Sequence, residues 1–205
     1  MHTRIKLSIV SLSAALLITL ATGSSAARNL SISHGELWRA IFNPIEFRSS
    51  GLTAAACTVT LEGSFHAVTA PKVERSLVGS ITRATVGICR SGSVTVLQET
   101  LPWHIQYSGF LGRLPDITGV RLIGIGVSYR VRDAIFGSVC LSRTTAEEPA
   151  AVIAELEAGE GNRNVIGVKA DSGPRILCGS LNGQFSGTAS VVEPTRGERL
   201  LVRLI

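Results

Sequence analysis

The sequence is poor in the residues from which catalytic and metal sites are most often built. Aspartate occurs only at positions 116, 133 and 171, and the four histidines are His2, His34, His66 and His104. No C-x-x-C or H-x-x-x-H pair occurs, so the spacing gives no support for a zinc site. No G-x-S-x-G elbow marks a hydrolytic serine. This scarcity leaves few ways to assemble an active site, and we expect neither a metal nor a cofactor.

Lysine is scarce, and the basic residues as a whole are scattered along the chain. Lysine occurs only at positions 6, 72 and 169, the formal net charge is +5 at pH 7, and no two basic residues are adjacent. A nucleic-acid surface needs clustered Lys and Arg. The sequence therefore predicts no nucleic-acid partner.

The first 27 residues have the order of a secretory signal peptide. A basic segment with Arg4 and Lys6 precedes the apolar run Leu7–Ala21, and the small residues of Gly23–Ala27 follow. The apolar run is shorter than the roughly 20 residues of a spanning helix. We predict cleavage, a mature chain that begins at Ala27 or Arg28, and no membrane span afterwards. Residues 28–205 would then form a single secreted or cell-envelope domain; an uncleaved N-terminal signal anchor is the alternative.

All four cysteines lie in the exported part of the chain, at Cys57, Cys89, Cys140 and Cys178. Export brings thiols into an oxidising environment, and an even number of them favours disulfides. Three pairings are possible for four cysteines. We expect Cys57–Cys89 and Cys140–Cys178, because each pair brackets one contiguous set of expected strands.

The region from Asn29 to Ile205 consists of short segments rich in Val, Ile, Thr and aromatic residues, separated by Gly, Pro, Asn and Ser. This pattern predicts an all-β, mainly antiparallel domain without a large helix, either a sandwich or a closed barrel. Clear expected strands cover residues 58–62, 93–99 and 199–205. The apolar stretch 119–131 predicts one strand that is covered on both faces. At its glycines we expect the strand to bend, or another part of the backbone to come close to it.

Residues 146–158 carry conflicting signals. A capping-box pattern around Thr144 and Glu147, with Pro149 behind it, favours a helix. Alternation through residues 152–158, a turn-like segment and a second alternating run over 165–170 favour a hairpin. We predict the hairpin, because local propensity is a weak guide against tertiary context.

The pattern L-x-G-x-F occurs at residues 61–65 and again at 181–185, each time after a cysteine. Three matched positions of common residue types arise easily, so we infer no repeat.

Residues 58–66 and 99–110 resemble segments of a group of exported β-rich proteins of actinobacterial genomes that have no assigned activity. The likeness covers roughly Cys57 to Ile125 and implies bacterial export, but it brings no catalytic or ligand-binding residue with it.

The densest group of aromatic and polar residues lies between Leu101 and Pro115. In an extended strand Trp103, Ile105 and Tyr107 share one face, and His104 and Gln106 share the other. An aromatic platform of Trp103 and Tyr107 rimmed by His104 would suit a sugar ring or an apolar ligand. An aromatic stripe of this kind more often fills a core. We therefore predict that Trp103 and Tyr107 point inward.

The sequence favours a non-catalytic secreted or cell-envelope module with a binding or structural role, its ligand an envelope polysaccharide or an apolar molecule. The alternative is a secreted hydrolase whose site the sequence does not identify. Glycoside hydrolysis needs two facing carboxylates. Glu62, Glu99 and Asp116 are available, but their spacing supports no pair.

Overall fold

The computed structural model describes residues 29–49, 52–113, 116–135, 137, 139–145, 147, 150–158, 164–171, 176–178 and 181–204. Within these ranges the chain is built of strands and one short 3-10 turn, so the all-β prediction is confirmed. The elements are β1 (Asn29–Ile32), β2 (Leu37–Ser49), β3 (Leu52–Phe65), β4 (Thr69–Pro71), β5 (Leu77–Ser91), β6 (Ser93–Val96), η1 (Gln98–Thr100), β7 (Trp103–Arg113), β8 (Asp116–Ile125), β9 (Ser128–Arg132), β10 (Val139–Arg143), β11 (Ala150–Ala158), β12 (Asn164–Asp171), β13 (Ile176–Cys178), β14 (Leu181–Val192) and β15 (Leu201–Leu204). In this described part no helix has the length and hydropathy needed to span a membrane.

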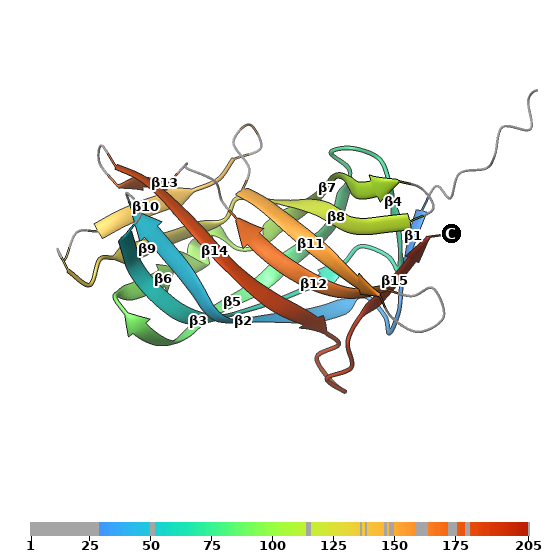
Figure 1. The fold of residues 1–205 in the computed structure, drawn as a ribbon, viewed down its shortest axis with the longest axis horizontal. Helices are drawn as coiled ribbons and strands as arrows, with labels where there is room; N and C mark the ends of the chain where they lie inside the picture. The colour runs from blue at the N-terminus through green and yellow to red at the C-terminus, as the bar shows by residue number, and fades with distance from the viewer. Residues whose placement is uncertain are drawn as a thin grey trace, which may run out of the picture.

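The main sheet curls, and its strand pairings form a ring (Figure 1). The order is β14-β2-β3-β5-β7-β8-β11-β12, every pair is antiparallel, and β12 pairs in turn with β14. These pairings describe a curled antiparallel sheet, closer in form to a half-barrel than to a sandwich of two flat sheets. Closure satisfies the backbone hydrogen-bonding groups that a free sheet edge would expose.

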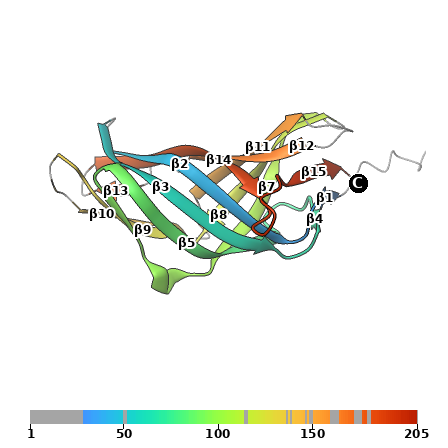
Figure 2. The same cartoon turned by 90° about the horizontal axis from the view of Figure 1, so that it is seen from below.

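A second, three-stranded sheet consists of β6, β9 and β10. Figure 2 shows β9 and β10 at one end of the molecule and β1, β4 and β15 at the other, as does Figure 1. Pairing between β5 and β7 stops at Ile81 and Trp103, although β5 continues to Ser91. β6 follows β5 and packs against both β5 and β3. The second sheet thus adds a wall where β7 has left β5.

The apolar stretch over residues 119–131 forms two strands rather than the single one expected. β8 ends at Ile125 in the main sheet, and β9 begins at Ser128 in the second sheet. Gly126 between them has φ +79°, a conformation that glycine adopts at low cost. The expected bend therefore lies at Gly126 and is sharp enough to carry the chain from one sheet to the other.

The strand expected over residues 93–99 is also shorter than predicted. β6 ends at Val96, and the amide of Thr100 turns back to the carbonyl of Leu97 at the start of η1. A local turn thus ends β6 earlier than the alternating pattern indicates. The last strand covers Leu201–Leu204 of the expected 199–205, and residue 205 lies outside the described residues.

The hairpin predicted for residues 146–158 and the run after them is confirmed over the described strands β11 and β12. β11 pairs with β12 from Val152 opposite Ala170 to Ala158 opposite Asn164. The other edge of β11 pairs with β8. Strand partners on both edges satisfy the backbone, which explains why the helical propensity of this segment is overridden.

The inward face of β2 changes phase in the middle of the strand. Trp38, Ala40 and Phe42 are buried before the change, and Ile45 and Phe47 are buried after it. The pairing with β3 shifts register between Phe42 and Ile45, as at a β-bulge. An extra residue in one strand moves the following side chains to the opposite face. Both short runs of large side chains therefore point into the interior.

One of the two expected disulfides is seen. Cys57 and Cys89 lie opposite each other on β3 and β5 and are bonded, with their Cα atoms 3.9 Å apart, so this pairing is confirmed. The side chains of Cys140 and Cys178 lie outside those that the structure describes, although β10 and β13, which carry them, are neighbours. The expected signal peptide also lies outside the described residues.

Candidate functional site

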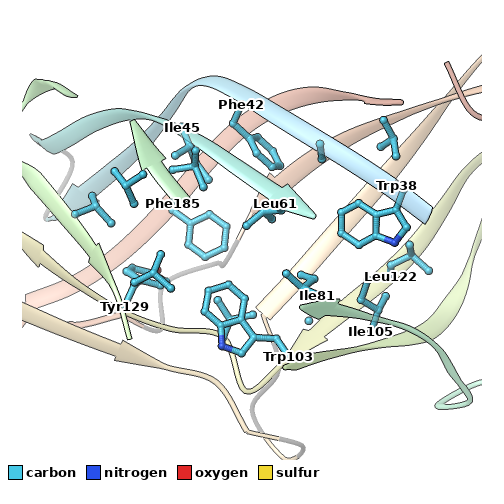
Figure 3. A pocket seen from close by; sticks show the side chains of 18 of the residues that line it. Trp38, Phe42, Ile45, Leu61, Ile81, Trp103, Ile105, Leu122, Tyr129 and Phe185 are labelled. Atoms are coloured by element: carbon cyan, nitrogen blue, oxygen red, sulfur yellow. The ribbon is translucent and has the colours of Figure 1, made fainter. Parts of the chain in front are cut away.

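A cavity of about 120 Å³ lies inside the molecule, between the main sheet and the second sheet (Figure 3). Its walls come from the inward faces of β2, β3, β5, β6, β7, β8, β9 and β14. The lining residues are Trp38, Ala40, Phe42, Ile45, Phe47, Val59, Leu61, Phe65, Ile81, Val86, Val94, Val96, Trp103, Ile105, Leu122, Gly124, Val127, Tyr129, Phe185 and Val191. None of these side chains is charged, and the only polar side-chain atoms in the described wall are the indole nitrogens of Trp38 and Trp103 and the hydroxyl of Tyr129.

Three aromatic rings join the main sheet to the second sheet on one side of the cavity. Phe47 of β2, Tyr129 of β9 and Phe185 of β14 have centroids 5.1, 5.8 and 6.0 Å apart, with Tyr129 edge-on to the other two. Edge-to-face pairs stabilise by about 0.5–1.5 kcal/mol beyond the area that they bury. The cluster thus fixes the second sheet as one wall of the cavity.

Two tryptophans line the cavity, and their indole nitrogens differ in environment. Nε1 of Trp103 donates to Oγ1 of Thr100 at 2.8 Å. Nε1 of Trp38 is buried, and no hydrogen-bond acceptor reaches it among the described residues. The ring of Trp38 packs on Phe65, with centroids 6.1 Å apart. The indole of Trp38 therefore lines the cavity with its carbon atoms, while its nitrogen is buried.

The two L-x-G-x-F segments occupy related positions in the fold. They lie on β3 and β14, the two strands that flank β2. Phe65 lies beside Trp38, and Phe185 lies opposite Phe47, so each phenylalanine pairs with an aromatic of β2. Both phenylalanines line the cavity. The pattern thus marks cavity wall on either side of β2.

The predicted alternation along β7 is confirmed. Trp103 is 3% and Tyr107 4% exposed, whereas His104 is exposed. The three candidate binding residues do not form one surface, because His104 is on the opposite face of β7 and only Trp103 lines the cavity. Tyr107 belongs to the core, where burial raises the pKa of its hydroxyl.

Sequence reasoning missed the largest contributor to the cavity, which is β2. Its signal was present in two short alternating runs, Trp38-x-Ala40-x-Phe42 and Ile45-x-Phe47. The runs are out of phase with each other, so neither is long enough to stand out as a strand face.

Of the carboxylates considered for hydrolysis, Glu62 and Glu99 do not line the cavity, and the side chain of Asp116 lies outside those that the structure describes. Glu62 lies on β3 and binds the guanidinium groups of Arg39 and Arg83, which hold the pKa of its carboxyl below the ordinary range, chiefly through the hydrogen bond from Arg39. Glu99 is exposed on η1. Across the described side chains, no group of three or more His, Cys, Asp or Glu residues is placed to hold a metal ion.

Comparison with known proteins brings no assignment, since no family model, curated protein or solved structure matches this chain. The cavity and the two tryptophans that line it are therefore the features of this chain that bear most directly on its function.

Proposed function

We propose that this protein is a non-catalytic, exported binding module that holds a small apolar molecule in the cavity between its two sheets. The observation that carries the proposal is the cavity itself, with a volume of about 120 Å³ and an apolar wall. An engineered cavity of about 150 Å³ with a similar lining stays dry and binds benzene. Small β-barrels can hold one small ligand in the interior.

An apolar ligand fits this wall better than a sugar. Sugar hydroxyls moved out of water need hydrogen-bond partners, and burial without them is costly. The described wall offers aliphatic and aromatic groups, and its only polar side-chain atoms are the indole nitrogens of Trp38 and Trp103 and the hydroxyl of Tyr129. Of these, Trp103 already donates to Thr100. We therefore favour the apolar ligand over an envelope polysaccharide.

Export is the second part of the proposal. The Cys57–Cys89 disulfide supports it, because such bonds persist in oxidising compartments. The order of residues 1–27 supports it independently. N-terminal sequencing of secreted material should begin at Ala27 or Arg28. Recovery of the chain solely as the intact Met1 form in the membrane fraction would contradict cleavage.

The binding part is tested with benzene. We expect benzene to raise the unfolding temperature in proportion to its concentration, as a ligand of the folded state does. Ala40→Leu adds bulk inside the cavity and should abolish this shift, because Ala40 is a lining residue. Ile41→Phe is the matched control, since Ile41 is the next residue of β2 and is 46% exposed.

Two outcomes would overturn the binding proposal. The first is a parent protein whose unfolding temperature does not respond to benzene. The second is a folded Ala40→Leu variant that responds as strongly as Ile41→Phe and the parent. Calorimetric titration with benzene measures the same binding directly.

A further inference from the structure

We propose that the protein docks on a lipid surface with anionic headgroups through the outer face of its second sheet. The outer face consists of those side chains of β6, β9 and β10 that point away from the cavity. Its members are Ser93, Thr95, Arg130, Arg132, Val139, Leu141 and Arg143, and all seven are exposed. The proposal goes beyond the ligand-binding function and does not depend on it.

The two faces of the second sheet differ because side chains alternate along each strand. Val94, Tyr129 and Val131 point inward and are at most 8% exposed. Val94 and Tyr129 line the cavity, and Figure 3 shows the ring of Tyr129 pointing into it. The residues that alternate with them point the other way, into solvent. The outer face is therefore the solvent side of a cavity wall.

The strand register gathers three arginines on the outer face. Arg130 and Arg132 are two residues apart on β9, so they lie on the same face with about 7 Å of strand between them. Arg143 of β10 lies opposite Ser128, which makes Arg143 a diagonal neighbour of Arg130. Three positive charges thus collect in one small area, although basic residues are scattered along the sequence.

The second sheet supplies no negative charge to balance these arginines. Its strands β6, β9 and β10 contain neither aspartate nor glutamate. Asp133 follows β9, but its Oδ1 accepts from the amide of Ile135 in the turn. Among the described residues, none of the three arginines belongs to an ion pair. Since guanidinium groups pair strongly with phosphate and carboxylate, the outer face is complementary to a partner with several anionic groups.

Aliphatic side chains beside the arginines favour a lipid surface over a soluble acidic polymer. Leu141 lies directly opposite Arg130 and is 41% exposed. Val139 lies directly opposite Arg132 and is 49% exposed. The turn that joins β9 to β10 adds Ile135, which is 67% exposed. Anionic headgroups offer partners to the arginines, and the acyl boundary beneath them takes aliphatic side chains out of water. A soluble acidic polymer offers only the first of these.

Docking through the outer face brings one wall of the cavity next to the lipid, because the inner face of the same sheet lines the cavity. Small apolar molecules leave water for apolar surroundings, so in the extracytoplasmic space they collect in lipid. The outer face thus gives the proposed binding function a source of its ligand.

Vesicle sedimentation tests the docking. The secreted protein is mixed with vesicles of phosphatidylcholine alone or of phosphatidylcholine with phosphatidylglycerol, and the bound fraction is measured after centrifugation. We expect binding to the vesicles that contain phosphatidylglycerol and almost none to the others. Arg130→Gln combined with Arg132→Gln should weaken this binding by about 25-fold, because one basic residue near an anionic surface contributes about fivefold.

The control for this variant is Arg121→Gln combined with Arg196→Gln. It removes the same net charge from exposed arginines outside the second sheet, one on β8 and one in the turn after β14. We expect it to bind the anionic vesicles as the parent does. All four positions are exposed, so both variants should unfold at the parent's denaturant midpoint.

The aliphatic contribution has its own test. Leu141→Ser removes exposed apolar surface without a change in charge, and it should weaken vesicle binding by at least about twofold. Ile41→Ser is the control, because Ile41 is 46% exposed on β2 and lies outside the second sheet. Soluble polyphosphate measures the attraction of the arginines alone, so Leu141→Ser should leave its binding unchanged.

Three results would overturn the proposal. The first is a parent that does not sediment with the phosphatidylglycerol vesicles; if it binds polyphosphate, the outer face recognises an acidic polymer instead. The second is an Arg130, Arg132 variant that binds the vesicles as well as its control. The third is a Leu141→Ser variant that binds the vesicles as tightly as the parent, which would show adsorption by charge alone. Benzene binding in the cavity is measured separately, so each of these results leaves the proposed function standing.

Discussion

Gly63 lies directly opposite Trp38 in the pairing of β2 with β3, and the indole lies across the position that a side chain at residue 63 would take. A Cβ atom there would come within 2.8 Å of Cζ2 of Trp38 and closer still to the backbone oxygen of Ser80. The oxygen belongs to β5, the other neighbour of β3, and cannot move without the strand. Glycine at this position is therefore what allows Trp38 to occupy the cavity wall.

We predict that Gly63→Ala lowers the free energy of unfolding by about 1–3 kcal/mol, the usual range for overpacking a core. Gly87→Ala is the control, because a Cβ atom on that glycine of β5 would meet Thr58 at an ordinary 3.5 Å. The control should be neutral or more stable by up to about 1 kcal/mol, since alanine reduces the entropy of the unfolded chain. Denaturant unfolding measures both. Equal midpoints for the two variants would show that Gly63 has no special role.

Trp103 is expected to be a core residue first and a ligand contact second. It is 3% exposed, and we predict that Trp103→Ala costs about 3–5 kcal/mol of stability. Trp103→Phe keeps the ring but loses the hydrogen bond to Thr100, and it should cost less. If Trp103→Ala unfolds at the parent's denaturant midpoint and with the same slope, the residue is not packed as described.

Glu62 should make folding stability depend on pH in acid. Hydrogen bonds and the charges of Arg39 and Arg83 lower the pKa of its carboxyl below 4.5 in the folded protein. A lowered pKa adds stability above the unfolded-state value and loses it as the pH falls through the folded-state value. We predict that Glu62→Gln is less stable than the parent at pH 7 and that this difference shrinks below about pH 4.5.

The matched control for Glu62 is Glu46→Gln, which breaks the exposed pair with Arg48. Exposed ion pairs contribute only about 0–1 kcal/mol, so this variant should stay close to the parent across the titration. Chemical denaturation at a series of pH values tests the pair of variants. A difference between Glu62→Gln and the parent that is constant from pH 7 to pH 3 would contradict the prediction.

Cys140 and Cys178 are predicted to form a second disulfide. They are carried by β10 and β13, which lie next to each other in the fold. Non-reducing peptide mapping of secreted protein should give one linked peptide with Cys57 and Cys89 and a second with Cys140 and Cys178. Alkylation of Cys140 and Cys178 without prior reduction would show instead that both remain thiols.

The sequence predicts those parts of the fold whose local pattern agrees with their surroundings. Trp103, Ile105 and Tyr107 alternate with polar residues in one uninterrupted strand. Their burial can be predicted from this alternation alone, because successive side chains of a strand point to opposite faces. The hairpin of β11 and β12 is likewise readable from two alternating runs joined by a turn-like segment.

The cavity could not be predicted, because its walls are set by events with weak local signals. The bulge after Phe42 reverses the phase of β2, and the turn at Gly126 moves the chain into another sheet. Both depend on which strands pair, and a single sequence does not specify that. The buried indole nitrogen of Trp38 could not be predicted either, because its lack of an acceptor depends on which groups the completed fold brings near.

The pairing of β2 with β14 joins segments from opposite ends of the sequence, with Phe47 directly opposite Phe185. A ribosome makes β2 long before β14, so the ring stays open while the strands between them are being made. During that interval the wall that β14 provides is missing. The side chains of Trp38, Phe42 and Phe47 are then exposed to water unless another molecule covers them. Apolar surface exposed in this way drives aggregation. The side chains that form the finished cavity are therefore those that the growing chain most needs to keep shielded.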